Sequence, residues 1–278
     1  MLFSFLFRLL YKTALFLGFL LVLLLVGLRL FFPSMVFHPT ATVRSTPQDL
    51  QLEYEDVTFQ SDGLALHGWY IPAYRARATV LFLHGSGGNI GNRMGHIRIL
   101  HDLGLSVFIF DYRGYGRSGG TASVKGVGKD ARAAWDWLVK EKGTSPSDIV
   151  LLGRSFGGAL ALELTRSVQP GALILESTFA SPFGFTRLDF LTPLMRFAVG
   201  DIWNPLEAAK RLTVPTLCIH SPDDGVVPFR EGQKLYNAIR GEKTFVQIRG
   251  GHNEGFAQSR STYTAALENF LADHFGRH

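Results

Sequence analysis

The sequence has little cysteine: Cys218 is the single one among 278 residues. No disulfide can therefore form within the chain, and the fold has to be held by packing alone. Cys218 lies in the apolar run 216–219, which is typical of a buried thiol in a strand. The nine histidines form no H-E-x-x-H motif and no pairing with cysteine, so we expect no metal site.

The sequence also lacks an excess of charge outside its N-terminal part. The net charge is +5, but four of the 28 lysine and arginine residues precede residue 45. Residues 45–278 carry 24 basic and 23 acidic groups, without a basic stripe interleaved with aromatic residues. This balance excludes a nucleic-acid footprint. Internal repeats and low-complexity tracts are missing as well, so we expect one large core, of undetermined oligomeric state.

What the chain does have, at its start, is a long hydrophobic run. Residues 13–28 carry no charge, and the run reaches residue 32 if Arg29 extends toward the interface, which makes 20 residues or about 30 Å of helix. This length predicts a membrane anchor over residues 1–34, with the lipid bilayer as partner. A cleaved signal peptide is the alternative, although no small-x-small site follows. Arg8 and Lys12 favour a cytoplasmic N-terminus with the remaining chain on the opposite side, a bias that Arg29 and Arg44 weaken.

Strand-like and helix-like patterns alternate through residues 45–278, which we interpret as one domain. Continuous apolar runs read as strands, and helical stretches separate most of them. The predicted strands are 64–71, 79–83, 106–110, 149–152, 172–175, 214–219 and 244–248, and the predicted helices are 126–142, 156–168, 230–240 and 259–275. This alternation predicts an α/β fold with a mostly parallel central sheet and helices on both faces.

A serine between glycines is the strongest chemical signal in the chain. Gly153, Ser155 and Gly157 form a G-x-S-x-G motif between the strand 149–152 and the helix 156–168. Such a strand-turn-helix exposes a serine hydroxyl, and glycine relieves the crowding that a sharp turn creates. Ser155 is therefore a candidate nucleophile.

A serine nucleophile needs a base and an acid that orients the base. His252 follows the last predicted strand and is the candidate base. Asp224, after the strand 214–219, is the favoured acid, while Asp223 beside it and Glu176 at the end of another strand stay open. The order nucleophile, acid, histidine is the one expected of an α/β-hydrolase.

These motifs resemble membrane-anchored α/β-hydrolase-domain proteins related to monoacylglycerol lipases, lysophospholipases and protein depalmitoylases. The resemblance spans about residues 50–275 and rests on the segments 83–89, 111–118, 153–158, 224–228 and 251–253. It implies an α/β-hydrolase fold, with the N–H groups of Ser86 and Phe156 as the oxyanion hole. Ser86 stands where such proteins often have glycine or asparagine.

One glycine motif points elsewhere. Gly114, Gly116 and Gly119 match the dinucleotide fingerprint G-x-G-x-x-G, but residues 121–125 delay the helix that should begin inside it. We therefore expect a plain glycine-rich loop and no cofactor.

The segment 177–205 is an apolar insertion where the resembling fold commonly carries a cap. We expect it either to pack internally or to form the wall of an acyl groove. Its candidate substrate-binding residues are Phe179, Phe183, Leu188 and Trp203. Together with the anchor, this segment favours a serine hydrolase that acts on an amphiphilic ester or thioester. Acylated proteins are among the substrates of this kind. The alternatives are a serine peptidase or amidase, and a non-catalytic membrane-tethered scaffold.

Overall fold

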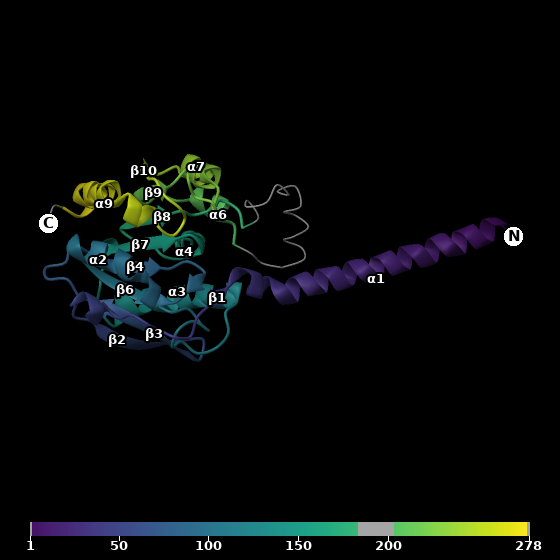
Figure 1. Cartoon of the computed structure of the whole chain (residues 1–278), viewed down its shortest axis with the longest axis horizontal. Coiled ribbons are helices and arrows are strands. Elements are labelled where there is room, and N and C mark those ends of the chain that lie inside the picture. The colour runs from purple at the N-terminus through teal and green to yellow at the C-terminus, as the bar shows by residue number, and fades with distance from the viewer. Residues whose placement is uncertain (1, 183–202, 277–278) are drawn as a thin grey trace.

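An open sheet of eight strands lies at the centre of residues 2–182 and 203–276, the part of the chain that the computed structural model describes (Figure 1). Its strands form from apolar and β-branched runs, which suit a pleated surface buried on both faces. In chain order they are β2 (Glu55–Ser61), β3 (Leu64–Ile71), β4 (Ala78–Leu83), β6 (Leu105–Phe110), β7 (Ile149–Arg154), β8 (Ala172–Glu176), β9 (Thr216–His220) and β10 (Lys243–Gln247). The seven predicted strands are all present among these eight.

The strands lie in the order β10-β9-β8-β7-β4-β6-β3-β2. All pairs from β10 to β6 are parallel, whereas β3 is antiparallel to both β2 and β6. The prediction of a mostly parallel sheet is confirmed. Only β2 has no counterpart among the apolar runs, because its buried residues Val57, Phe59 and Ser61 alternate with exposed ones at the edge of the sheet.

Helices connect most of the strands, as the sequence pattern predicts. The four predicted helices are present, with ends that differ by a few residues. After the N-terminal helix, the helices within the described residues are α2 (Met94–Asp102), α3 (Val124–Lys140), α4 (Phe156–Leu164), α6 (Pro205–Ala209), α7 (Phe229–Ala238), α8 (Gly255–Gln258) and α9 (Arg260–Phe275). Short 3-10 helices cover Pro47–Leu50, Ile90–Arg93 and Pro146–Asp148, and the two-residue strands β1 (His38–Pro39) and β5 (Gly87–Gly88) pair with each other.

Side chains of the central strands alternate between two covered faces. On β4, Leu81 and Leu83 belong to one apolar cluster with residues of α3 and α4. Val80 and Phe82 belong to a second cluster with residues of α2 and α9. Because both faces are covered, the loops at the carboxyl ends of the parallel strands are left to form a site.

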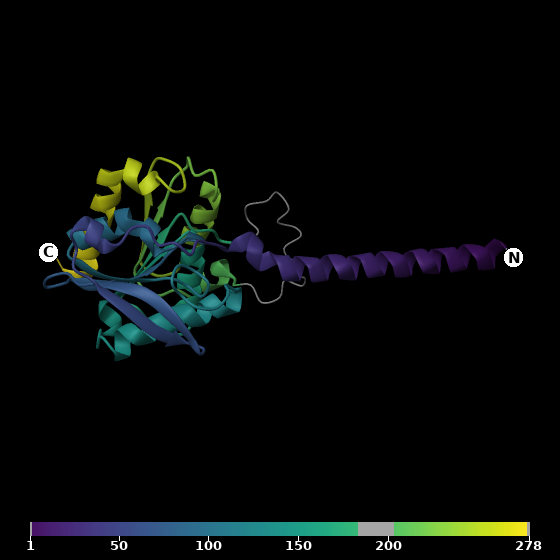
Figure 2. The same cartoon turned by 60° about the horizontal axis from the view of Figure 1, so that its bottom comes forward.

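The N-terminal helix α1 (Leu2–Val36) extends away from the rest of the fold (Figures 1 and 2). Its apolar side chains are exposed, with Phe3 at 85% and Leu10 at 69% of their full accessibility. By length and composition α1 can cross a membrane, and the same two properties also suit a signal sequence. The predicted apolar helix is confirmed as a helix.

The loop with the G-x-G-x-x-G match does not open a helix. The Gly114 N–H donates to the Gly119 carbonyl at 3.0 Å, and α3 begins only at Val124. Gly116 has a φ of 49°, and a Cβ there would lie 1.9 Å from Oδ2 of Asp111. The segment therefore turns tightly around a buried carboxylate and presents no helix N-terminus to a phosphate.

Candidate active site

Ser155 occupies the sharp turn between β7 and α4. Its φ of 54° and ψ of −119° lie where residues other than glycine are rarely found, a strain typical of functional turns. Glycines flank it because the backbone is crowded: a Cβ at Gly153 would lie 2.5 Å from the Gly157 carbonyl oxygen, and one at Gly157 would lie 1.9 Å from that of Leu83. The predicted strand-turn-helix is present, and it places the hydroxyl at the carboxyl edge of the sheet.

His252 lies in the loop after β10 and contacts Ser155 across 97 positions of sequence. Its Nε2 is 3.0 Å from the Ser155 Oγ, and its Nδ1 is 2.7 Å from Oδ2 of Asp224. These distances suit proton transfer at one nitrogen and orientation through the other. The structure thus brings together the three residues that the sequence proposes as nucleophile, base and acid.

Asp224 lies in the loop after β9 with a fully buried side chain. Burial raises its pKa, but hydrogen bonds from His220, His252 and the backbone outweigh that effect, and the net pKa lies well below the ordinary value. Two of these bonds reach Oδ1 from the N–H groups of Val226 and Val227, at 2.9 and 2.8 Å. The carboxylate is therefore held charged and oriented toward the imidazole.

The two alternative acids have other partners. Oδ2 of Asp223 accepts the Gly250 N–H at 3.1 Å. The carboxylate of Glu176 is buried against Arg154, His96 and Tyr263, at 3.2, 3.1 and 2.7 Å. Burial raises the pKa of Glu176, but His96, Arg154 and Tyr263 lower it to about 2. Of the three acids that the sequence leaves open, the structure places only Asp224 against His252.

The two N–H groups expected to form the oxyanion hole belong to Ser86 and Phe156. Phe156 is the first residue of α4, so its N–H has no acceptor within the helix. Ser86 follows β4 and lines the same cavity as Ser155. Its carbonyl accepts hydrogen bonds from the His38 N–H at 2.9 Å and from the Tyr115 hydroxyl at 2.6 Å. These bonds hold the Ser86 peptide beside the nucleophile.

The segment after α1 is part of this site, which the sequence does not reveal. β1 pairs in parallel with β5, directly after Ser86. The Phe37 ring packs edge-on against the Phe156 ring, with centroids 5.1 Å apart, and Phe37 is buried. The chain that leaves α1 therefore supports both predicted oxyanion donors. A two-residue strand has too short a pattern to be predicted from sequence.

Arg154, the residue before Ser155, links the turn after β7 to the loop that carries His252. Its Nε donates to Glu176, and a terminal nitrogen donates to the His252 carbonyl and to Oδ1 of Asn253. A buried ion pair thus anchors the loop that carries the imidazole. The sequence signal for Arg154 was its place inside the G-x-S-x-G motif, but its partners lie 22 to 99 positions away.

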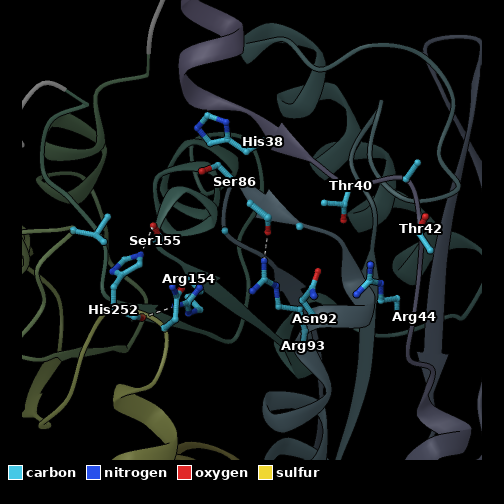
Figure 3. Close-up of a pocket in the computed structure, with 16 residues that line it drawn as sticks. His38, Thr40, Thr42, Arg44, Ser86, Asn92, Arg93, Arg154, Ser155 and His252 are labelled. Atoms are coloured by element: carbon cyan, nitrogen blue, oxygen red, sulfur yellow. Dashed lines mark hydrogen bonds between the residues drawn. The ribbon is translucent and has the colours of Figure 1, made fainter.

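A cavity of about 870 Å³ opens beside Ser155 and is lined by polar groups (Figure 3). In the figure Ser155, His252 and Arg154 lie on the left, Arg44 lies on the right, and Arg93 lies between them. We call this cavity the polar cavity. Arg44 and Arg93 carry no motif and were not predicted as site residues.

A second cavity of about 450 Å³ also reaches Ser155, and its lining is mainly apolar. We call it the apolar cavity. Two of the four residues predicted to contact substrate, Phe179 and Trp203, line it. Phe183 and Leu188 lie outside the described residues, as does most of the predicted insertion 177–205. The last turns of α1 contribute four side chains that were not predicted: Leu28, Phe32, Met35 and Val36.

Within residues 2–182 and 203–276, no group of three or more His, Cys, Asp and Glu side chains is arranged to hold a metal ion. Cys218 is buried in β9, and burial raises the pKa of its thiol to about 12. The chemistry available at the described site is that of the serine, the imidazole and the carboxylate.

Known proteins resemble this chain in sequence. Residues 74–201 match the family described as "Serine aminopeptidase, S33". The chain is 35% identical over 249 residues to "Alpha/beta hydrolase domain-containing protein WAV2" of Arabidopsis thaliana, with 81% of each protein covered. It is 34% identical over 235 residues to "Lysophosphatidylserine lipase ABHD12" of Mus musculus, covering 75% of this chain and 58% of the mouse protein.

The fold also resembles a solved structure. The esterase Pf2001 of Pyrococcus furiosus superposes with a TM-score of 0.73 at 23% identity. The match covers 87% of this chain and 99% of that protein. At this level of identity, the likeness establishes the common fold.

Proposed function

The chain belongs to the α/β-hydrolase family, and from that premise we propose that it is a serine hydrolase that cleaves carboxylic esters or thioesters of amphiphilic acyl compounds. One observation carries the proposal. His252 contacts Ser155 through one ring nitrogen and Asp224 through the other, at 3.0 and 2.7 Å. The fold by itself would not specify a reaction, since one fold hosts many chemistries.

The chemical steps follow from these contacts. The Ser155 Oγ attacks the acyl carbon while His252 Nε2 takes its proton, and Asp224 holds the Nδ1–H and stabilises the imidazolium. The N–H groups of Ser86 and Phe156 bind the oxyanion. His252 then protonates the leaving alcohol or thiol, and a water molecule, activated by the same imidazole, releases the acid from Ser155.

The two cavities that meet at Ser155 support an amphiphilic substrate. The apolar cavity, walled by Trp203 and by side chains such as Phe32 and Met35, suits an acyl chain, and the polar cavity suits the alcohol side of the ester. The mouse relative is named as a lipase of lysophosphatidylserine, which is such an amphiphile. An acylated protein would present the same acyl chain to the apolar cavity.

The alternative to this proposal is a serine peptidase or amidase, which the description of the matched family favours. The same triad cleaves esters and amides, so the geometry does not separate them. An esterase and a peptidase would differ in the leaving group that they prefer and in how strongly their rates depend on the length of the acyl chain.

A substrate panel tests the proposal. Purified full-length protein is assayed on matched esters, thioesters and amides with acyl chains of two to sixteen carbons. We expect turnover of esters and thioesters, with kcat/KM rising about tenfold or more as the chain lengthens, because each buried methylene contributes about 0.8 kcal/mol. Trp203→Ala should flatten this rise, and Tyr74→Ala, at an exposed position, should leave it unchanged. Faster cleavage of amides than of esters would favour the peptidase, and no dependence on chain length would exclude an acyl groove.

We further propose that α1 is an uncleaved membrane anchor. Its exposed apolar surface is costly in water and favourable in lipid. Full-length protein should remain in the pellet after carbonate extraction of membranes, whereas release into the supernatant would refute the anchor.

The positions of Arg8 and Lys12 orient the N-terminus toward the cytoplasm. Protease added on the cytoplasmic side of sealed vesicles should then leave the hydrolase domain intact.

A further inference from the structure

The polar cavity has an unusual balance of charge. Among the described residues that line it there are three arginines, Arg44, Arg93 and Arg154, and no aspartate or glutamate. Arg154 is neutralised by Glu176, which lies behind it. Arg44 and Arg93 have no ion-pair partner among residues 2–182 and 203–276. The cavity next to Ser155 therefore carries two guanidinium groups that no carboxylate within the described residues pairs with directly.

Arg93 is the more informative of the two, because it is only 9% exposed. One of its terminal nitrogens donates to the Gly87 carbonyl, and its Nε has no hydrogen-bond partner within the described residues. A buried charge without a counter-charge costs several kcal/mol unless another group compensates it. Burial and the nearby Arg154 lower the pKa of Arg93 to about 10, so it stays protonated at neutral pH.

Two buried carboxyl groups, those of Glu176 and Asp111, attract Arg93 without forming an ion pair with it. Glu176 is already paired with Arg154 and His96. Burial raises the pKa of Asp111 to about 7, although the Ile90 N–H and the charge of Arg93 favour its ionised form. Neither carboxyl group therefore gives Arg93 a counter-charge of its own. The cationic face of the cavity is left for a ligand.

Figure 3 shows how the two arginines are placed. Arg44 comes from the segment after β1, and Arg93 comes from the 3-10 helix before α2. In this view Arg93 lies between Arg154 and Arg44, and Arg44 lies farther from His252. A substrate whose ester carbon sits at Ser155, with its acyl chain in the apolar cavity, would extend its alcohol portion toward Arg93 and Arg44.

We propose that Arg93, with Arg44, forms an anion subsite that binds a phosphate or carboxylate on the alcohol side of the substrate. A guanidinium binds such groups with charge-assisted, often bidentate, hydrogen bonds. The proposal rests on the proposed serine hydrolase function and makes it more specific: the preferred substrates are anionic single-chain amphiphiles. Arg93 acts in binding, and it takes no part in proton transfer.

The kinetic test compares two substrates that differ in charge. Full-length protein in detergent micelles is assayed on 1-oleoylglycerol and on its 3-phosphate, and the ratio of the two kcat/KM values is the readout. We expect the phosphate ester to be preferred about tenfold or more, since a hydrogen bond to a charged group is worth about a factor of 10 to 100. Arg93→Gln should lower this ratio about tenfold, and Arg93→Lys should retain part of it. Arg98→Gln, on the exposed face of α2, is the control and should not change it.

Arg44→Gln keeps the test decisive if Arg93→Gln fails to fold. Because Arg44 is exposed, we expect this variant to fold and to lower the ratio about threefold. A neutral ester cleaved as fast as the phosphate ester, or equal losses on both substrates in the Arg93 and Arg44 variants, would overturn the subsite. A role of Arg93 limited to holding the Gly87 loop would reduce both substrates alike.

A binding measurement separates failure of the subsite from failure of the hydrolase function. Glycerol 3-phosphate should raise the melting temperature of Ser155→Ala protein but not that of a Ser155→Ala, Arg93→Gln double variant. This result would support the subsite even if no ester were cleaved. If inorganic phosphate stabilises the protein equally well while the substrate ratio does not depend on Arg93, the site binds free phosphate and the substrate assignment is wrong.

Discussion

Ser155→Ala is expected to lower kcat for ester hydrolysis about a millionfold, the loss typical of removing the nucleophile of a serine hydrolase. Without the Oγ no acyl-enzyme can form, and the imidazole 3.0 Å away has no proton to accept. The fold should be unaffected, because alanine is close in size to serine and leaves the backbone bond from residue 155 to the Glu176 carbonyl in place. The measurement is turnover of a medium-chain ester by full-length protein.

The same variant should lose covalent labelling by a fluorophosphonate probe. Ser147→Ala, in the exposed 3-10 helix before β7, is a matched control and should keep both labelling and turnover. Labelling that persists in Ser155→Ala would assign the nucleophile elsewhere. If folded wild-type protein is neither labelled nor active, the chain is a membrane-tethered scaffold that keeps the hydrolase fold.

Asp224→Asn has the second largest expected effect, a loss of about 10⁴-fold in kcat. An amide cannot stabilise the imidazolium, and its NH₂ group favours the wrong tautomer of His252, whose Nδ1 is 2.7 Å from the present carboxylate. Val226 and Val227 would still donate to the remaining side-chain oxygen, so the loop should keep its shape. The measurement is kcat with saturating substrate, together with the melting temperature.

Asp223→Asn is the matched control, since Asp223 is adjacent but accepts only the Gly250 N–H rather than the imidazole. It should lower kcat less than tenfold, because the amide oxygen of asparagine can still accept the Gly250 N–H. Equal losses in the two variants would mean that the loop, and not the contact with His252, is what matters. Because the pKa of Asp224 is lowered, its carboxylate stays ionised even at a pH below the ordinary pKa of an aspartate. The wild-type pH–rate profile from about pH 5 to pH 9 should therefore show no step from its protonation.

The triad candidates could be found from the sequence because their signals are local. The crowding around Ser155 demands glycine at 153 and 157, and a turn of this kind is visible in five residues. His252 and the acid follow apolar runs whose ends are the carboxyl ends of strands β10 and β9. Parallel strands bring their carboxyl ends to one edge of the sheet, so the strand pattern alone predicts that residues following these ends lie in one site.

The choice among the three acids could not be made in this way. Asp223 and Asp224 are neighbours in one loop, and Glu176 ends a strand of the same sheet. What separates them is where each carboxylate lies relative to the His252 ring and which other groups it contacts. That difference is set by Arg154, His96 and Tyr263 around Glu176, and by the turn after β9 around Asp224.

By itself, the sequence determined the α/β architecture and the apolar N-terminal helix, and it singled out the serine and the histidine that we propose as nucleophile and base. Each of these depends on short-range periodicity or on the sterics of a single turn, which act within a few residues. Only the tertiary structure decided that Phe37 and β1 support the loop of Ser86, that α1 lines the apolar cavity, and that Arg44 and Arg93 line one cavity with Ser155. These contacts join residues tens of positions apart, and they form because packing the whole core leaves one arrangement of the loops, which no local pattern encodes.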